Sequence, residues 1–136
     1  MKSDKKLFLV VDDDSDDQDL FREALREIDT TAICATAEHG FDALRQLYLG
    51  LKPDYIFLDL NMPRMDGWKC LAELKKDPKL KDIPVIIFTT SKAQRDRDET
   101  LALGAAHFIT KPLDFDTLKD EIIFVMQTDW SQKTMA

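Results

Sequence analysis

Five short runs of hydrophobic residues recur along the chain, and each run ends at polar or turn-forming residues. The most continuous run covers residues 55–58, ends on Asp59 and is followed by the turn residues Asn61 and Pro63. A run of about four to eight apolar residues between turn signals is typical of a strand that is covered on both faces, as in a parallel sheet. The other four strands are predicted at residues 5–11, 31–36, 84–88 and 106–109.

Between these runs, apolar residues recur at helical spacing. The pattern predicts helices over residues 15–28, 41–51, 68–77, 92–103 and 115–126, of which 92–103 has the weakest apolar stripe. At the start of the first helix, Ser15 and Gln18 have the spacing of a capping box. Asp16 and Asp17 suit the positive end of the helix dipole, so we interpret them as structural.

The alternation of strands and helices predicts an α/β fold, a five-stranded doubly wound parallel sheet with five helices on its two faces. Of the common strand orders for such sheets, 2-1-3-4-5 suits five strands. This order places the carboxyl ends of the first and third strands side by side, where ligands bind in open α/β sheets. Asp12, Asp13 and Asp59 are therefore expected to converge.

Length and composition limit the classes of function. The chain has 136 residues, of which 44% are hydrophobic and 33% charged, as expected for one domain with its own core. We assign residues 1–128 to this domain and residues 129–136 to a C-terminal tail that frays. The net charge of −7 argues against nucleic-acid binding, and no stretch has the length of a membrane span or signal peptide. Cys34 and Cys70 are expected to be free thiols, and the protein to be cytoplasmic.

The predicted carboxylate cluster points to metal-assisted phosphoryl chemistry. Three carboxylates in one crevice repel one another unless a cation neutralises them, and a set of oxygen ligands suits Mg²⁺. Asp59 can also be a nucleophile, because carboxylates attack phosphoryl groups to form acyl phosphates. Thr89 and Lys111 follow the fourth and fifth strands and could hold the remaining phosphoryl oxygens.

These motifs resemble the receiver domain of two-component response regulators, which has a flavodoxin-like fold, and in particular the stand-alone receivers that partner phytochrome-type kinases. The resemblance covers nearly the whole chain. It rests on Val11-Asp12-Asp13, the segment Asp59-Leu60-Asn61-Met62-Pro63-Arg64-Met65-Asp66-Gly67, Phe88-Thr89-Thr90 and Lys111-Pro112, in the order and roughly the spacing of the family.

The resemblance implies that Asp59 is the phosphoacceptor. It also implies that Asp13, Asp59 and the backbone carbonyl of Asn61 bind Mg²⁺ directly, whereas Asp12 acts mainly through metal-bound water.

The resemblance further implies that Thr89 is the switch hydroxyl, that Lys111 is the phosphoryl-binding cation and that Phe108 is the switch aromatic. The family often has a tyrosine at this last position. On phosphorylation, Thr89 is expected to move toward the phosphoryl group and Phe108 to move inward. The Lys111-Pro112 bond is expected to be cis, so that the sharp turn aims the lysine into the crevice.

The implied function is a signalling switch that catalyses only its own phosphorylation and dephosphorylation and has no output domain. Its partners would be a sensor histidine kinase or a histidine phosphotransfer protein. Phe124, on the outer side of the last helix, and the weakly amphipathic residues 92–103 predict a partner or homodimer surface on the fourth helix, fifth strand and fifth helix.

Two alternatives belong to other classes. A haloacid-dehalogenase-like phosphatase also uses a strand-tip aspartate with Mg²⁺, but it has a second aspartate two residues further on, where this chain has Asn61. An amide cannot serve as the general acid for turnover. The other alternative is a scaffold with the same fold that is never phosphorylated, and phosphate uptake by Asp59 would distinguish it.

Overall fold

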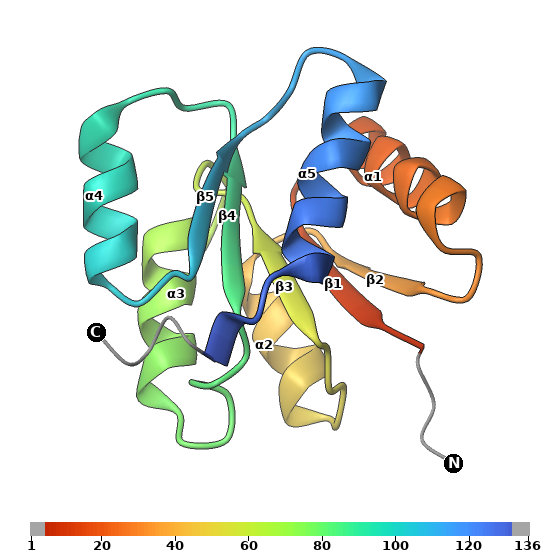
Figure 1. The fold of residues 1–136 in the computed structure, drawn as a ribbon. Helices are drawn as coiled ribbons and strands as arrows, with labels where there is room; N and C mark the ends of the chain where they lie inside the picture. Colours follow the sequence, from red (N-terminus) through yellow and green to blue (C-terminus); the bar gives the residue numbers. More distant parts are fainter. Residues whose placement is uncertain (1–4, 132–136) are drawn as a thin grey trace.

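A five-stranded parallel sheet forms the centre of the structure, a computed structural model that describes residues 5–131 (Figure 1). The strands are β1 (Leu7–Val11), β2 (Ile33–Ala37), β3 (Tyr55–Leu58), β4 (Val85–Thr89) and β5 (His107–Thr110). The helices are α1 (Ser15–Ile28), α2 (Gly40–Tyr48), α3 (Gly67–Lys76), α4 (Gln94–Ala102) and α5 (Phe115–Gln127).

The strand order is β2-β1-β3-β4-β5, and every neighbouring pair is parallel, which confirms the predicted topology. β1 lies between β2 and β3, and its last residue Val11 is in register with Ala37 on one side and Leu58 on the other. The residues that directly follow β1 and β3 therefore leave the sheet at the same edge. This register brings Asp12 and Asp59 together.

Each face of the sheet has its own hydrophobic core, because side chains alternate between the two faces along a strand. In β1, Phe8 and Val10 pack toward α1 and α5, whereas Leu9 and Val11 pack toward α2 and α3. Figure 1 shows α1 beside α5, and α4 alongside β5 at the opposite edge of the sheet from β2. β3 and β4 are buried at every position, as their continuous apolar runs predict, whereas the edge strand β2 is mostly exposed or half-buried.

An aromatic cluster fixes α1 on the sheet. The fully buried ring of Phe21 lies 4.7 Å from the ring of Phe57 in β3 and 5.9 Å from that of Phe88 in β4, measured between centroids. Phe8 in β1 joins the same cluster. Such pairs contribute about 0.5–1.5 kcal/mol each beyond the burial of their surface. The first turns of α1 are thereby held over the carboxyl edge of β1, β3 and β4.

The start of α3 packs directly on the backbone of the residue that follows β3. A Cβ atom added to Gly67 would lie 2.3 Å from the carbonyl oxygen of Asp59, a distance that excludes any side chain. The Gly67 N–H donates to the carbonyl of Leu60 at 3.0 Å. This close approach lets the loop of residues 59–66 return tightly to the sheet, with Arg64 at a positive φ of 66°.

Two local predictions are wrong. No peptide bond among residues 5–131 is cis, so Lys111-Pro112 is trans, and the lysine reaches the crevice through its long side chain instead. The chain does not simply fray after Gln127, because the Trp130 ring is buried and its indole N–H donates to the carbonyl of Val125 at 2.9 Å. Residues 132–136 of the predicted tail lie outside the described residues.

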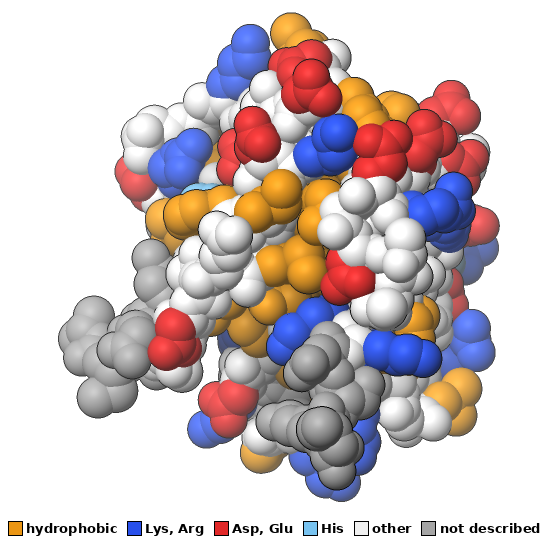
Figure 2. Space-filling view, turned by 45° about the vertical axis from the view of Figure 1, so that its right-hand side comes forward, with side chains coloured by type: hydrophobic (Ala, Val, Ile, Leu, Met, Phe, Trp, Pro, Cys, Tyr) orange, Lys and Arg blue, Asp and Glu red, His pale blue; other side chains and the backbone are white. Residues whose placement is uncertain are grey.

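The charge distribution is uneven. Figure 2 shows acidic side chains gathered toward the upper right of the molecule, in the part that carries α1, and hydrophobic side chains nearer the middle of the same face. The first turn of α1 contains Asp16 and Asp17 directly after the acidic run at residues 12–14. In the part of the chain that the structure describes, no helix has both the length and the apolar character needed to cross a bilayer.

Candidate functional site

Three carboxylates meet at the carboxyl edge of the sheet, as predicted. Oxygen atoms of Asp12, Asp13 and Asp59 all lie within 4.8 Å of one another. Backbone hydrogen bonds hold two of these residues in place, because the Asp12 N–H donates to Ala37 and the Asp59 N–H donates to Val11. Asp12 and Asp59 are buried, whereas Asp13 is exposed to solvent.

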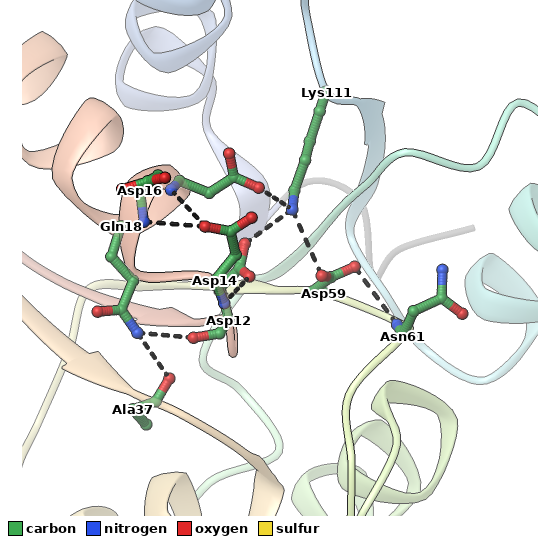
Figure 3. Close-up of polar contacts among 9 residues, drawn as sticks. Asp12, Asp14, Asp16, Gln18, Ala37, Asp59, Asn61 and Lys111 are labelled. Carbon is green, nitrogen blue, oxygen red and sulfur yellow. Dashed lines mark hydrogen bonds and ion pairs between the residues drawn. The ribbon is translucent and has the colours of Figure 1, made fainter.

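Lys111 supplies a cation to this cluster from the end of β5 (Figure 3). Its Nζ lies 2.8 Å from Asp12 Oδ2, 2.7 Å from Asp17 Oδ2 and 3.4 Å from Asp59 Oδ2. The backbone N–H of Lys111 donates to the Thr89 carbonyl at 2.7 Å, which fixes the point from which the side chain extends. The structure thus brings together the predicted phosphoacceptor and the predicted phosphoryl-binding cation.

Burial and charge act in opposite directions on these groups. Burial raises the pKa of Asp12, and its contacts with Lys111 and with the Asp14 N–H offset this only in part. For Lys111, burial alone would lower the pKa, but hydrogen bonds to Asp12 and Asp17 and the charge of Asp59 outweigh it and raise the pKa above its usual range. The ammonium therefore stays charged at neutral pH.

Thr89 lies at the end of β4 with its side chain fully buried. Its hydroxyl has no hydrogen-bond partner among the described residues. A buried hydroxyl without a partner costs about 1–3 kcal/mol, so its retention needs a reason. A hydroxyl donor directly beside the Asp59 strand is suited to receive a ligand oxygen.

Phe108 in β5 is already buried, with 3% of its surface exposed. The Arg97 guanidinium from α4 lies over the ring, 4.8 Å from its centroid, and also donates to the Phe108 carbonyl at 3.5 Å. The ring is thus buried beneath Arg97 in this structure, and its movement on phosphorylation stays a prediction. Arg97 and Phe108 therefore make a cation–π contact.

Asn61 lies two residues beyond Asp59, with its side chain exposed. Its backbone N–H donates to Asp59 Oδ1 at 3.4 Å, so this residue borders the crevice (Figure 3). The assignment of its carbonyl as a metal ligand stays a prediction.

The start of α1 differs from the prediction. Asp14, not Ser15, caps the helix, since its side chain accepts from the backbone N–H groups of Asp16 and Asp17. Gln18 does not complete a capping box. Its amide donates to the carbonyl of Asp12 at 2.6 Å and thereby ties α1 to the site.

Asp17 is a site residue that the sequence interpretation missed. It was assigned to the helix dipole, yet it makes the shortest carboxylate contact of Lys111. The signal was present in the helical periodicity, because Asp17 lies one turn before Phe21 and therefore on the same side of α1 as a core residue.

The donor set fits a magnesium ion. All the side-chain ligands offered are carboxylate oxygens, and the buried Asp12 Oδ2 is paired with Lys111 Nζ at 2.8 Å. Mg²⁺ is usually held by one or two carboxylates together with waters and phosphate oxygens. Asp12, Asp13 and Asp59 are the residues that would hold it.

Comparisons with known proteins agree with this geometry. Residues 8–123 match the family described as the response regulator receiver domain. The fold is similar to a crystal structure of the phosphorylated cyanobacterial phytochrome response regulator RcpA, with 32% identity, a TM-score of 0.83 and coverage of 90% of this chain and 92% of that chain. It is also similar to the Mn(2+)-bound form of the response regulator Rcp1, with 29% identity, a TM-score of 0.82 and coverage of 91% and 96%.

A curated relative shows the same family within a larger protein. The chain is 36% identical over 107 residues to the sensor histidine kinase CheAY of Helicobacter pylori, a match that covers 78% of this chain. The chain spans only 13% of the length of that kinase. The similarity therefore concerns one domain of the relative.

We expect Mg²⁺ to stabilise the protein through the carboxylate cluster. Bound metal relieves the repulsion among the carboxylates, and a ligand at a hundred times its Kd adds about 2.7 kcal/mol to the free energy of unfolding. The measurement is thermal unfolding with and without Mg²⁺. Asp13→Asn should lose most of the increase in Tm, whereas Asp16→Asn, which removes an exposed acid outside the cluster, should keep it. Equal increases in both variants would contradict the metal site.

Proposed function

The chain belongs to the response regulator receiver domain family, and we propose on that basis that it is a phosphorylation-dependent switch of a two-component signalling system. Asp59 accepts a phosphoryl group from the phosphohistidine of a sensor histidine kinase or a histidine phosphotransfer protein. The observation that carries the proposal is the surroundings of Asp59: a buried carboxylate with the Lys111 ammonium 3.4 Å away, two further carboxylates for a metal and the unpartnered Thr89 hydroxyl nearby.

In the proposed reaction, a carboxylate oxygen of Asp59 attacks the phosphorus atom and the phosphorus–nitrogen bond to the donor imidazole breaks. The electron pair of that bond stays on the imidazole nitrogen, and an acyl phosphate forms on Asp59. Mg²⁺, when bound, neutralises negative charge that accumulates on the phosphoryl oxygens. Lys111 and Thr89 each donate a charge-assisted hydrogen bond to a phosphoryl oxygen, which is the positioning that phosphoryl transfer requires.

The protein is proposed to catalyse only its own phosphorylation and dephosphorylation. A phosphatase of the haloacid-dehalogenase type would need an acid two residues after the nucleophile, and Asn61 cannot donate a proton in that role. The alternative of a scaffold that is never phosphorylated leaves the buried, unpartnered Thr89 hydroxyl unexplained. A cytoplasmic location follows from the proposed partner, whose phosphohistidine is made there.

The proposed output surface is formed by α4, β5 and α5. α4 buries only Thr100, so it is weakly anchored in the core. Phe124 on α5 is 48% exposed, and its ring lies 5.2 Å from that of His107 and 6.2 Å from that of Trp130. It is therefore part of an aromatic cluster and not an isolated surface residue. Such a cluster next to a weakly anchored helix is suited to bind a partner or a second copy.

Phosphorylation of Asp59 tests the proposal directly. With Mg²⁺ and acetyl phosphate, intact-mass spectrometry should show one added phosphoryl group on the wild type and none on Asp59→Asn. Asp54→Asn, a matched change of an aspartate that precedes β3 instead of following it, should behave as the wild type. Equal phosphorylation of Asp59→Asn would refute the assignment, and steady phosphate release from a generic phosphomonoester would favour the phosphatase.

Thr89→Val tests the switch hydroxyl. Because that hydroxyl is buried without a partner, its removal should leave the unphosphorylated protein as stable as before or more stable by about 1 kcal/mol. The variant should still bind Mg²⁺ with beryllofluoride but lose the change in amide hydrogen exchange of α4 and β5 that binding causes in the wild type. An undiminished change in exchange would show that another group transmits the signal.

Phe124→Asp tests the output surface. A charge beside His107 and Trp130 should weaken self-association that depends on Mg²⁺ and beryllofluoride by roughly tenfold or more. The reason is the loss of about 1–2 kcal/mol of binding free energy from the burial of apolar surface. Sedimentation velocity measures this. Leu20→Asp is the control, since Leu20 is similarly exposed (49%) but lies on α1. If Phe124→Asp associates as the wild type does, the output surface lies elsewhere.

A further inference from the structure

Asp17 contributes a fourth carboxylate to the site, and its contact with Lys111 has no part in the reaction proposed above. We infer that Asp17 is a positioning residue that holds the Lys111 ammonium in the unphosphorylated protein and competes with the phosphoryl group for it. The inference deepens the proposed function and rests on it. Asp17 would set how readily Asp59 takes up a phosphoryl group.

The distances support competition. The Lys111 ammonium has three hydrogens to donate, and its two short contacts are with Asp17 at 2.7 Å and Asp12 at 2.8 Å. The contact with the phosphoacceptor Asp59 is the longest, at 3.4 Å. The cation is thus held closer to the carboxylates of Asp17 and Asp12 than to that of the phosphoacceptor.

Both ends of this ion pair are anchored. Asp17 follows the Asp14 cap in the first turn of α1, and one turn later Phe21 is fully buried in the aromatic cluster. The backbone of Lys111 is tied to Thr89 by a hydrogen bond of 2.7 Å. With both backbones fixed, the flexible lysine side chain is the part that can move between Asp17 and a phosphoryl oxygen.

A phosphoryl group on Asp59 adds negative charge near Lys111 and draws the ammonium toward it. The contact with Asp17 then lengthens or is lost, so it stabilises the unphosphorylated protein more than the phosphorylated one. Removal of the Asp17 charge should therefore lower the stability of the free protein and raise its affinity for a phosphoryl mimic. A purely structural role would lower both stability and binding, so the opposite signs distinguish the two.

The test uses the full chain with Mg²⁺ and beryllofluoride, titrated by calorimetry. Asp17→Asn should bind beryllofluoride about two- to fivefold more tightly than the wild type, the range expected from a partly exposed ion pair. Asp16→Asn removes the same charge from the preceding residue, which is exposed and makes no hydrogen bond or ion pair with Lys111 among the described residues, and should change the affinity less. This control separates the specific contact from the general loss of negative charge.

A second measurement tests whether Asp17 acts through Lys111. In free protein, Asp17→Asn should lower the Tm in the wild-type background and leave it nearly unchanged in a Lys111→Gln background. Equal losses of Tm in both backgrounds would overturn the inference. So would beryllofluoride binding by Asp17→Asn that is no tighter than that of Asp16→Asn. If the wild type binds no beryllofluoride, the proposed function fails and the inference fails with it.

Discussion

The ammonium group of Lys111 is the interaction on which the rest of the site depends. It lies within 3.4 Å of carboxylates from three different elements: Asp12 after β1, Asp17 in α1 and Asp59 after β3. Only the parallel order that places β1 beside β3 makes this meeting possible, because both strands then end at the same edge. One cation cannot neutralise the cluster, and the remaining negative charge is what makes a divalent metal favourable there.

The fold could be predicted from the sequence because its main determinants are local and periodic. Apolar runs gave the buried strands, helical spacing gave the helices, and the preference for right-handed crossovers limited the strand order. The convergence of Asp12, Asp13 and Asp59 followed from that order, since a residue directly after a strand has little freedom of position. The predicted ends of the helices and strands lie within a few residues of the observed ones, and the helix most shortened relative to its prediction is α4.

What could not be predicted depends on the reach and direction of single side chains. Asp17 and Asp16 have the same charge and neighbouring positions, but only Asp17 lies on the side of α1 from which Lys111 can be reached. Trp130 packs back on α5 although it lies beyond the end of the helical pattern, and Lys111 enters the crevice without a cis bond. The Arg97 guanidinium lies over the buried Phe108 ring, a contact between residues on different elements that spacing does not reveal.

The central claim is that the Asp59 crevice is a phosphoryl site whose cation is Lys111. The most direct measurement is a crystal structure with Mg²⁺ and beryllofluoride. The account predicts beryllofluoride on an Asp59 carboxylate oxygen, the metal on the Asp13 side, and Lys111 Nζ moved from Asp17 to within hydrogen-bond distance of a fluoride. Beryllofluoride absent from Asp59 at saturating concentration, with Mg²⁺ bound and Lys111 still on Asp17, would contradict it.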